Sequence, residues 1–112
     1  MFTLSVDVPA AGAARLRLAG HLDQPAARQV LHAAADVVKC GCLRLVVDLG
    51  EVVSYDDEAA YAVTGCARLA RWLPEGVAVV AGEGAGVDLA ELAGVATHAH
   101  PPAGSMASCP AC

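Results

Sequence analysis

Acidic residues crowd one stretch in the middle of the chain, and no Lys or Arg interrupts them. The acids of this stretch are Asp48, Glu51, Asp56, Asp57 and Glu58. Neighbouring carboxylates such as Asp56 and Asp57 have the chemistry for general acid–base catalysis, because a carboxyl group can hold and release a proton. Adjacent side chains at the start of a helix point apart into solvent, however, and the sequence places no His, Ser or Cys to form a nucleophile–base pair with them. The pattern therefore predicts a protein that is not an enzyme.

A second set of reactive side chains gathers near the end of the sequence. His98, His100, Cys109 and Cys112 are candidate zinc ligands, because imidazole and thiolate groups suit Zn²⁺. The two cysteines have a suitable spacing, but the two histidines lie closer together than in the usual zinc motifs. A redox role for the cysteine pair would need a following helix to lower the thiol pKa, and no chain follows. We therefore expect neither a metal nor a cofactor.

The glycines between 82 and 86 could suggest a phosphate-binding loop. The segment Gly82-Glu-Gly-Ala-Gly86 follows a predicted strand and precedes a predicted helix. It lacks the full dinucleotide-binding spacing and the Gly-Lys-Ser/Thr ending of a P-loop. The sequence therefore predicts an ordinary turn here.

Composition narrows the class of protein further. Hydrophobic residues make up 56% of the 112 residues, which is enough for a core, and aromatic residues only 4%, so that core is aliphatic. The net charge of −5 argues against binding to nucleic acid or to an anionic membrane surface, since both require clustered cations. No targeting signal and no membrane-inserting segment is evident. We therefore expect a cytoplasmic protein whose five cysteines are mostly reduced thiols.

Hydrophobic periodicity predicts the elements that position these residues. Alternating residues from Phe2 to Val8 and from Arg15 to Leu18 predict two strands joined as a hairpin. A helix is predicted from Gln24 to Lys39, because Asp23 suits its N-cap and Gly41 can take a left-handed closing conformation.

The second half of the chain alternates strands and helices. The apolar run within Leu43–Leu49 is typical of a strand buried on both faces. Further elements are predicted in the order helix Asp57–Leu73, strand Val77–Ala81, helix Val87–Ala93 and edge strand Val95–Thr97. Such alternation predicts an α/β sandwich with a mixed sheet of four to five strands and about three to four helices. Residues 1–97 would form this domain, and residues 98–112 a flexible Pro-, Ala- and Cys-containing tail.

The order and spacing of three segments resemble the STAS domain family, which includes the anti-sigma factor antagonists. The segments are Leu18–Asp23, Leu45–Leu49 and Val53–Asp56, and the similarity extends over roughly residues 2 to 97. Its most specific positions are Gly20, Asp23, Asp48 and Asp56. The resemblance implies a STAS-like sandwich.

The resemblance also implies a phosphorylation site at the start of the second predicted helix. Regulatory members of the family carry Asp-Ser-Ser-Gly or Asp-Ser-Ala-Gly there, and a partner kinase, which is also the anti-sigma factor, phosphorylates the first Ser. The matching residues here are Asp56-Asp57-Glu58-Ala59, so Asp57 replaces the phosphoacceptor. A phosphoserine carries a charge of about −1.5 to −2, and Asp57 with Glu58 supplies a similar charge permanently. Acids in a first helical turn are also ordinary helix stabilisers, each contributing about 0.3–1 kcal/mol.

The resemblance thus predicts a protein-interaction domain that binds an anti-sigma factor of the serine-kinase type, with the phosphorylation switch lost or locked. The predicted partner-binding residues are Gly20, His21, Asp23, Ser54, Tyr55, Asp56, Asp57 and Glu58. One alternative is a phosphorylation-independent STAS subunit of a transporter complex. Another is a metal or thiol sensor that acts through the tail. The oligomeric state stays open.

Overall fold

Five strands form one mixed sheet in the computed structural model, which describes residues 1–82, 84–95 and 97–98. The strands are β1 (Phe2–Ala10), β2 (Ala13–Leu22), β3 (Arg44–Tyr55), β4 (Val77–Val80) and β5 (Thr97–His98). They lie in sequence order across the sheet. β1 and β2 pair antiparallel as the predicted hairpin, and each later pair is parallel. The predicted mixed α/β sheet is confirmed.

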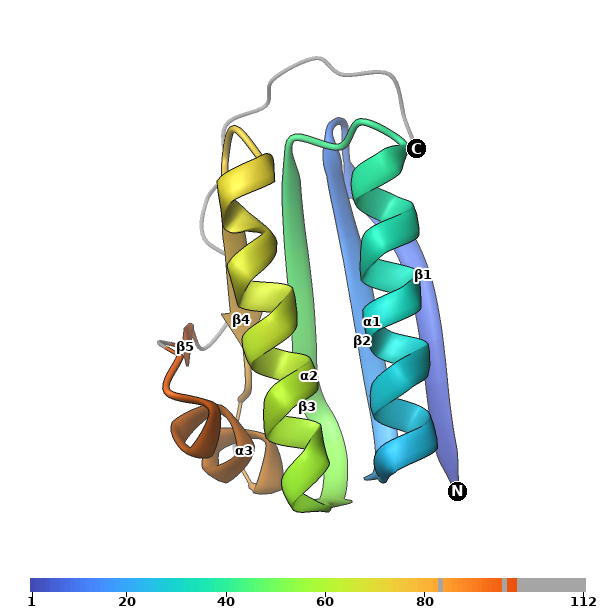
Figure 1. Cartoon of the computed structure of the whole chain (residues 1–112), viewed down its shortest axis with the longest axis vertical. Coiled ribbons are helices and arrows are strands. Elements are labelled where there is room, and N and C mark those ends of the chain that lie inside the picture. The colour runs from blue at the N-terminus through green and yellow to red at the C-terminus, as the bar shows by residue number, and fades with distance from the viewer. Residues whose placement is uncertain (83, 96, 99–112) are drawn as a thin grey trace.

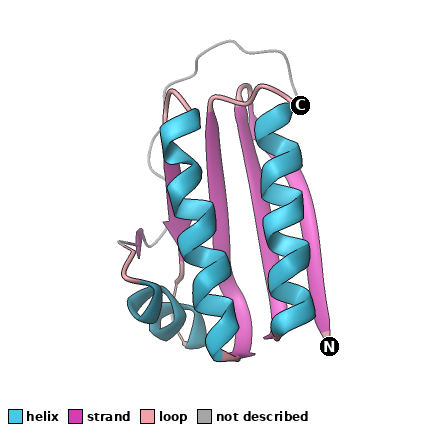
Figure 2. Cartoon of the chain, viewed as in Figure 1, coloured by secondary structure: helices cyan, strands magenta, loops and turns pink. Residues whose placement is uncertain are grey.

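Three α-helices connect the parallel strands. They are α1 (Gln24–Lys39), α2 (Asp57–Arg68) and α3 (Ala85–Ala93), and a 3₁₀ turn, Leu69–Trp72, follows α2. Figure 1 shows α1 and α2 side by side over one face of the sheet, with α3 beside the start of α2. Figure 2 shows the same two layers by element type. Parallel neighbours require such crossovers, because each chain must return to the same end of the sheet before the next strand begins.

The main core lies between the sheet and these helices and consists of aliphatic side chains. From the strands, alternate residues such as Leu16, Leu45 and Val47 are fully buried. From the helices, Val30 and Val63 meet them. Burial of each such side chain contributes about 1.5–3 kcal/mol. The expectation of a core built from Ala, Val and Leu is therefore confirmed.

A smaller apolar cluster lies on the other face of the sheet. Val46, Ala78 and Val80 form it, and all three are buried. Since strand side chains alternate between faces, these residues point away from the core that contains Val47 and Val79. β3 is thus buried on both faces, as its apolar run predicted.

β3 is longer than the sequence pattern indicated. The strand was expected to end at Leu49, with the acidic stretch in a loop, but it continues to Tyr55. The extension has a partner, because β2 also runs on to Leu22, and the two strands pair up to Leu22 and Tyr55 with two register shifts on the way. β-branched residues at Val52 and Val53 favour the extended backbone. Glu51 therefore lies in a strand, and a single residue, Asp56, separates β3 from α2.

The helix predicted from Asp57 to Leu73 is also corrected. Its regular part ends at Arg68, and the 3₁₀ turn completes it. The spacing of three and four residues would place Ala60, Val63, Ala67 and Ala70 together on one apolar face. The buried residues are instead Ala59, Ala62, Val63 and Cys66. The buried face of α2 is rotated relative to this set, because Ala60 and Ala67 lie at its margin and are only partly buried.

Smaller boundary differences occur near the end of the described chain. α3 begins at Ala85 and not at Val87, and Gly94 follows its last residue in a left-handed conformation. The last strand is Thr97–His98 and not Val95–Thr97. Position 86 in α3 requires a glycine, because a Cβ there would lie 2.3 Å from the Leu49 carbonyl oxygen. The predicted tail, residues 98–112, lies outside the described residues apart from the backbone of His98.

Candidate functional site

The ends of β2 and β3 bring two of the predicted segments together. His21 pairs with Ser54 and Leu22 with Tyr55 in the parallel register. The Asp56 N–H then donates a hydrogen bond of 3.0 Å to the Leu22 carbonyl, which holds the exit of β3 against the exit of β2. The predicted second strand ends at Leu18, but β2 continues through Gly20, His21 and Leu22. The candidate site is therefore formed by the paired ends of β2 and β3, which the start of α2 follows at once.

A His, a Ser and an Asp meet at these strand ends. The Nδ1 atom of His21 lies 2.7 Å from the Ser54 hydroxyl oxygen, and its Nε2 atom lies 3.5 Å from an Asp56 carboxylate oxygen. Leu22 and Tyr55 turn toward the core, so His21 and Ser54 project from the opposite side of their strands. The imidazole thus bridges a hydroxyl and a carboxylate.

This cluster corrects one prediction. The sequence analysis found no His or Ser placed to pair with the acidic residues, yet His21 contacts both Ser54 and Asp56. The two contacts span 33 and 35 positions in the chain, so periodicity within single elements carries no signal of them. Simple extension of the register from Arg17 and Asp48 would have placed His21 opposite Val52. Two register shifts along β2 and β3 bring it opposite Ser54 instead, so the sequence pattern did not indicate this pair.

Asp56 precedes α2 without capping it. The residue occupies the N-cap position in an extended conformation, but its side chain makes no capping hydrogen bond. The carboxylate turns to His21 instead. Asp57 and Glu58 occupy the exposed first turn of α2, where the positive end of the helix dipole favours negative charge. The helix start therefore presents three acids to solvent.

Asp23 and Gly20 have structural roles in the same region. The Asp23 carboxylate accepts a hydrogen bond of 3.0 Å from the Ala26 N–H and so caps α1, as predicted. Gly20 has a φ of +90°, and a Cβ there would lie 1.8 Å from the Met1 carbonyl oxygen. Both residues fix the approach of the chain to and from His21.

The remaining acids of the stretch, Asp48 and Glu51, are not part of the His21 cluster. Asp48 accepts a hydrogen bond of 2.9 Å from the Gly50 N–H and lies opposite Arg17 in the strand register. Glu51 is exposed on β3. Two exposed apolar side chains, Val53 and Tyr61, were not singled out in the sequence analysis, and they are 75% and 76% exposed. Val53 adjoins Ser54 on β3, and Tyr61 lies one turn beyond Asp57 and Glu58 on α2.

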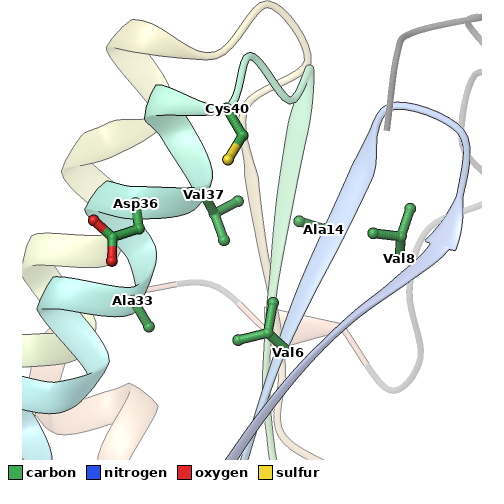
Figure 3. A pocket seen from close by; sticks show the side chains of 7 residues that line it. All are labelled: Val6, Val8, Ala14, Ala33, Asp36, Val37 and Cys40. Atoms are coloured by element: carbon green, nitrogen blue, oxygen red, sulfur yellow. The ribbon is translucent and has the colours of Figure 1, made fainter. Parts of the chain in front are cut away.

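Other possible sites lie elsewhere or outside the described chain. His100, Cys109, Cys112 and the His98 side chain are outside the described residues, and within those residues no cluster of three or more His, Cys, Asp or Glu could hold a metal ion. A pocket of about 270 Å³ opens between the β1–β2 hairpin and α1. Figure 3 shows its mostly apolar lining, which also includes Asp36 and Cys40. No helix of the described part of the chain is long and apolar enough to cross a membrane.

Comparison with solved structures identifies the architecture. The anti-sigma factor antagonist of Mycobacterium paratuberculosis superposes with a TM-score of 0.71 at 23% identity, over 84% of this chain and 79% of that one. The anti-sigma factor antagonist SpoIIAA in its unphosphorylated form superposes with a TM-score of 0.57 at 18% identity, over 70% and 72% of the two chains. The chain has the STAS fold.

A further solved structure matches this chain over only a small part of its own length. The crystal structure of Mglu matches with a TM-score of 0.58 at 24% identity, but over 67% of this chain and only 18% of that one. No family model and no curated protein sequence matches the chain. The resemblance predicted from Gly20, Asp23, Asp48 and Asp56 is thus confirmed at the level of the STAS fold.

Proposed function

We propose that this STAS domain is a non-catalytic interaction module that binds an anti-sigma factor of the serine-kinase type in the cytoplasm. The binding surface comprises Gly20–Asp23 on one segment and Ser54–Glu58 on the other. The observation that carries the proposal is the junction of β2, β3 and α2, where these two segments meet beside an exposed acidic helix start. The fold shared with two anti-sigma factor antagonists supports the choice of partner.

The surface has the composition of a recognition site. Asp57 and Glu58 form no ion pair with any described residue, since the ion pairs there involve Asp7, Asp56 and Glu75. Unpaired surface charges steer a partner of opposite charge during association. Tyr61 adds an exposed aromatic side chain of the type that forms interface anchors, and Val53 adds exposed apolar area. A partner with a basic rim around an apolar patch fits this surface.

Asp57 gives the surface a fixed charge. The first turn of a helix has unpaired N–H groups and a positive dipole end, and these favour an anion. A carboxylate at position 57 satisfies that preference and has no hydroxyl to modify. The domain therefore recognises its partner without a phosphorylation switch at this position.

Affinity capture tests the proposed partner. The full chain, tagged and expressed in its own cells, should retain an anti-sigma factor kinase that mass spectrometry identifies. The double variant Asp57→Asn with Glu58→Gln should bind this kinase roughly 10-fold more weakly, because each exposed charge contributes up to about 1 kcal/mol. The matched control is Asp36→Asn with Asp88→Asn, which removes two exposed acids from α1 and α3 and should leave affinity unchanged.

Two results would contradict the proposal. Retention of a membrane permease or its ATPase in place of the kinase would indicate the transporter-subunit alternative. Equal affinity of the test and control variants for the kinase would show that the start of α2 is not the binding surface.

A further inference from the structure

Ser54 has the surroundings of an activated hydroxyl. Its Oγ atom lies at a short hydrogen-bonding distance of 2.7 Å from His21 Nδ1. On the other side of the ring, His21 Nε2 faces the Asp56 carboxylate at 3.5 Å. A nucleophile beside a base, with the base oriented by a third group, is the arrangement that makes a weak hydroxyl reactive. Neither of these two contacts is needed to close the core, because His21, Ser54 and Asp56 all lie at the surface.

The setting favours a single modification over repeated catalysis. Ser54 is exposed at the end of an extended strand, so its hydroxyl is accessible to a second protein. The pocket of about 270 Å³ opens beside α1, and Ser54 does not line it. A hydrolase needs a shaped, water-excluding site next to its nucleophile. An acceptor residue needs only an accessible hydroxyl and a place for its proton.

We propose that Ser54 is a phosphoryl acceptor, with His21 as the base that takes its proton and Asp56 as the residue that orients His21. The phosphoryl donor is a nucleoside triphosphate bound to a protein kinase. This inference rests on the proposed function, since the kinase-type partner docks on the same surface. It assigns the reversible charge of that surface to position 54, three residues before the fixed charge of Asp57.

The step transfers one phosphoryl group to Ser54 and one proton to His21. The Ser54 oxygen forms a bond to the γ-phosphorus of the nucleoside triphosphate, and the bond from that phosphorus to the bridging β–γ oxygen breaks. The nucleoside diphosphate leaves with the electron pair of the broken bond. The hydroxyl proton passes to His21 Nδ1, and the resulting imidazolium is stabilised by the Asp56 carboxylate and by the new phosphate.

The residues after Ser54 also specify the class of kinase. Asp56, Asp57 and Glu58 follow the hydroxyl at the second, third and fourth positions. A kinase that accepts this segment needs a basic substrate groove, which matches the basic rim inferred for the partner. Phosphorylation would add a charge of about −1.5 to −2 beside these acids. The added charge alters the surface that the partner contacts.

Phosphate mapping on the full-length chain tests the inference. The chain is incubated with ATP and the soluble extract of its own cells, and peptide mass spectrometry locates the phosphate. We expect it on Ser54, absent in Ser54→Ala and retained in Ser5→Ala, because Ser5 is an exposed strand serine that lacks the His21 contact. His21→Gln should slow incorporation by about 100-fold, since general bases contribute at least this factor. Circular dichroism shows that each variant is folded.

The possible outcomes separate the two proposals. An anti-sigma kinase that is retained while Ser54 stays unphosphorylated overturns the acceptor assignment and leaves the proposed function standing. Phosphate on Ser54 without retention of such a kinase supports the acceptor and overturns the proposed partner. A rate unaffected by His21→Gln overturns the role of the imidazole, and phosphate on another residue overturns the assignment of Ser54.

Discussion

The Nδ1 atom of His21 lies 2.7 Å from the hydroxyl oxygen of Ser54, and this contact joins the ends of two parallel strands. The contact depends on β3 continuing to Tyr55, because a strand that ended at Leu49 would leave Ser54 in a loop without a fixed neighbour. The same extension reduces the β3–α2 connection to Asp56 alone. The strand register therefore sets the geometry of the whole candidate surface.

Gly20 should tolerate a side chain less well than Gly41, although both have a φ of +90°. Alanine strains the backbone at either position by about 1–2 kcal/mol. At Gly20 the new Cβ would also collide with the Met1 carbonyl oxygen, whereas nothing lies within 4 Å of the Cβ position at Gly41. Chemical denaturation should therefore show a larger loss of unfolding free energy for Gly20→Ala than for Gly41→Ala. Equal losses would indicate that Met1 moves aside without cost.

Asp23 and Asp56 should differ in their effect on stability, although each precedes a helix. The Asp23 carboxylate caps α1 through the Ala26 N–H, but Asp56 makes no capping hydrogen bond to α2. Asp23→Ala should lower the unfolding free energy by about 1 kcal/mol. Asp56→Ala should change it by no more than about 0.5 kcal/mol. Urea denaturation of both variants measures the difference, and an equal loss would contradict the distinction between a capping and a non-capping acid.

The sequence predicted features that depend on local periodicity and missed those that depend on pairing between distant segments. The bounds of α1 and its Asp23 cap followed from side-chain spacing and hydrogen-bonding chemistry. The extra length of β3 did not, because Gly50, Glu51 and Ser54 interrupt the apolar pattern and the strand persists through its pairing with β2. The His21 cluster was missed for the same reason. The buried face of α2 was misassigned because its alanines cover a wider face than the one that is buried, with Ala60 and Ala67 at the margin.

Cys66 should be protected from alkylation while Cys40 reacts. Both are free cysteines, but Cys66 is buried and Cys40 is exposed. Burial raises the pKa of the Cys66 thiol to about 12, from an ordinary value of 9.0, so the reactive thiolate is absent near neutral pH. Iodoacetamide labelling followed by peptide mass spectrometry should modify Cys40 in the folded protein and Cys66 only after denaturant is added. Labelling of Cys66 at the rate of Cys40 without denaturant would show that the core around it opens readily.

The Cys66 thiol should also make the protein less stable in alkali. Below about pH 9 the thiol is protonated in both the folded and the unfolded chain, and it adds no pH dependence. Between about pH 9 and pH 12 the unfolded chain loses this proton and the folded chain keeps it, so the unfolding free energy falls as the pH rises. Cys66→Ala should show a weaker decline over this range in urea denaturation. An identical decline in both proteins would assign the effect to other groups.

Asp57→Ser should create a second phosphoacceptor at the start of α2. The serine would stand directly after Asp56, in the arrangement found in regulatory STAS domains, and its phosphate would meet the positive end of the helix dipole. In the Ser54→Ala background, incubation with ATP and the captured kinase should label this variant at position 57 and leave the Ser54→Ala parent unlabelled. Glu58→Ser in the same background is the matched control, since it places the hydroxyl one position later and should remain unlabelled. If Asp57→Ser binds the kinase with unchanged affinity and takes up no phosphate, Asp57 is a helix-stabilising acid and not the fixed counterpart of a phosphoserine.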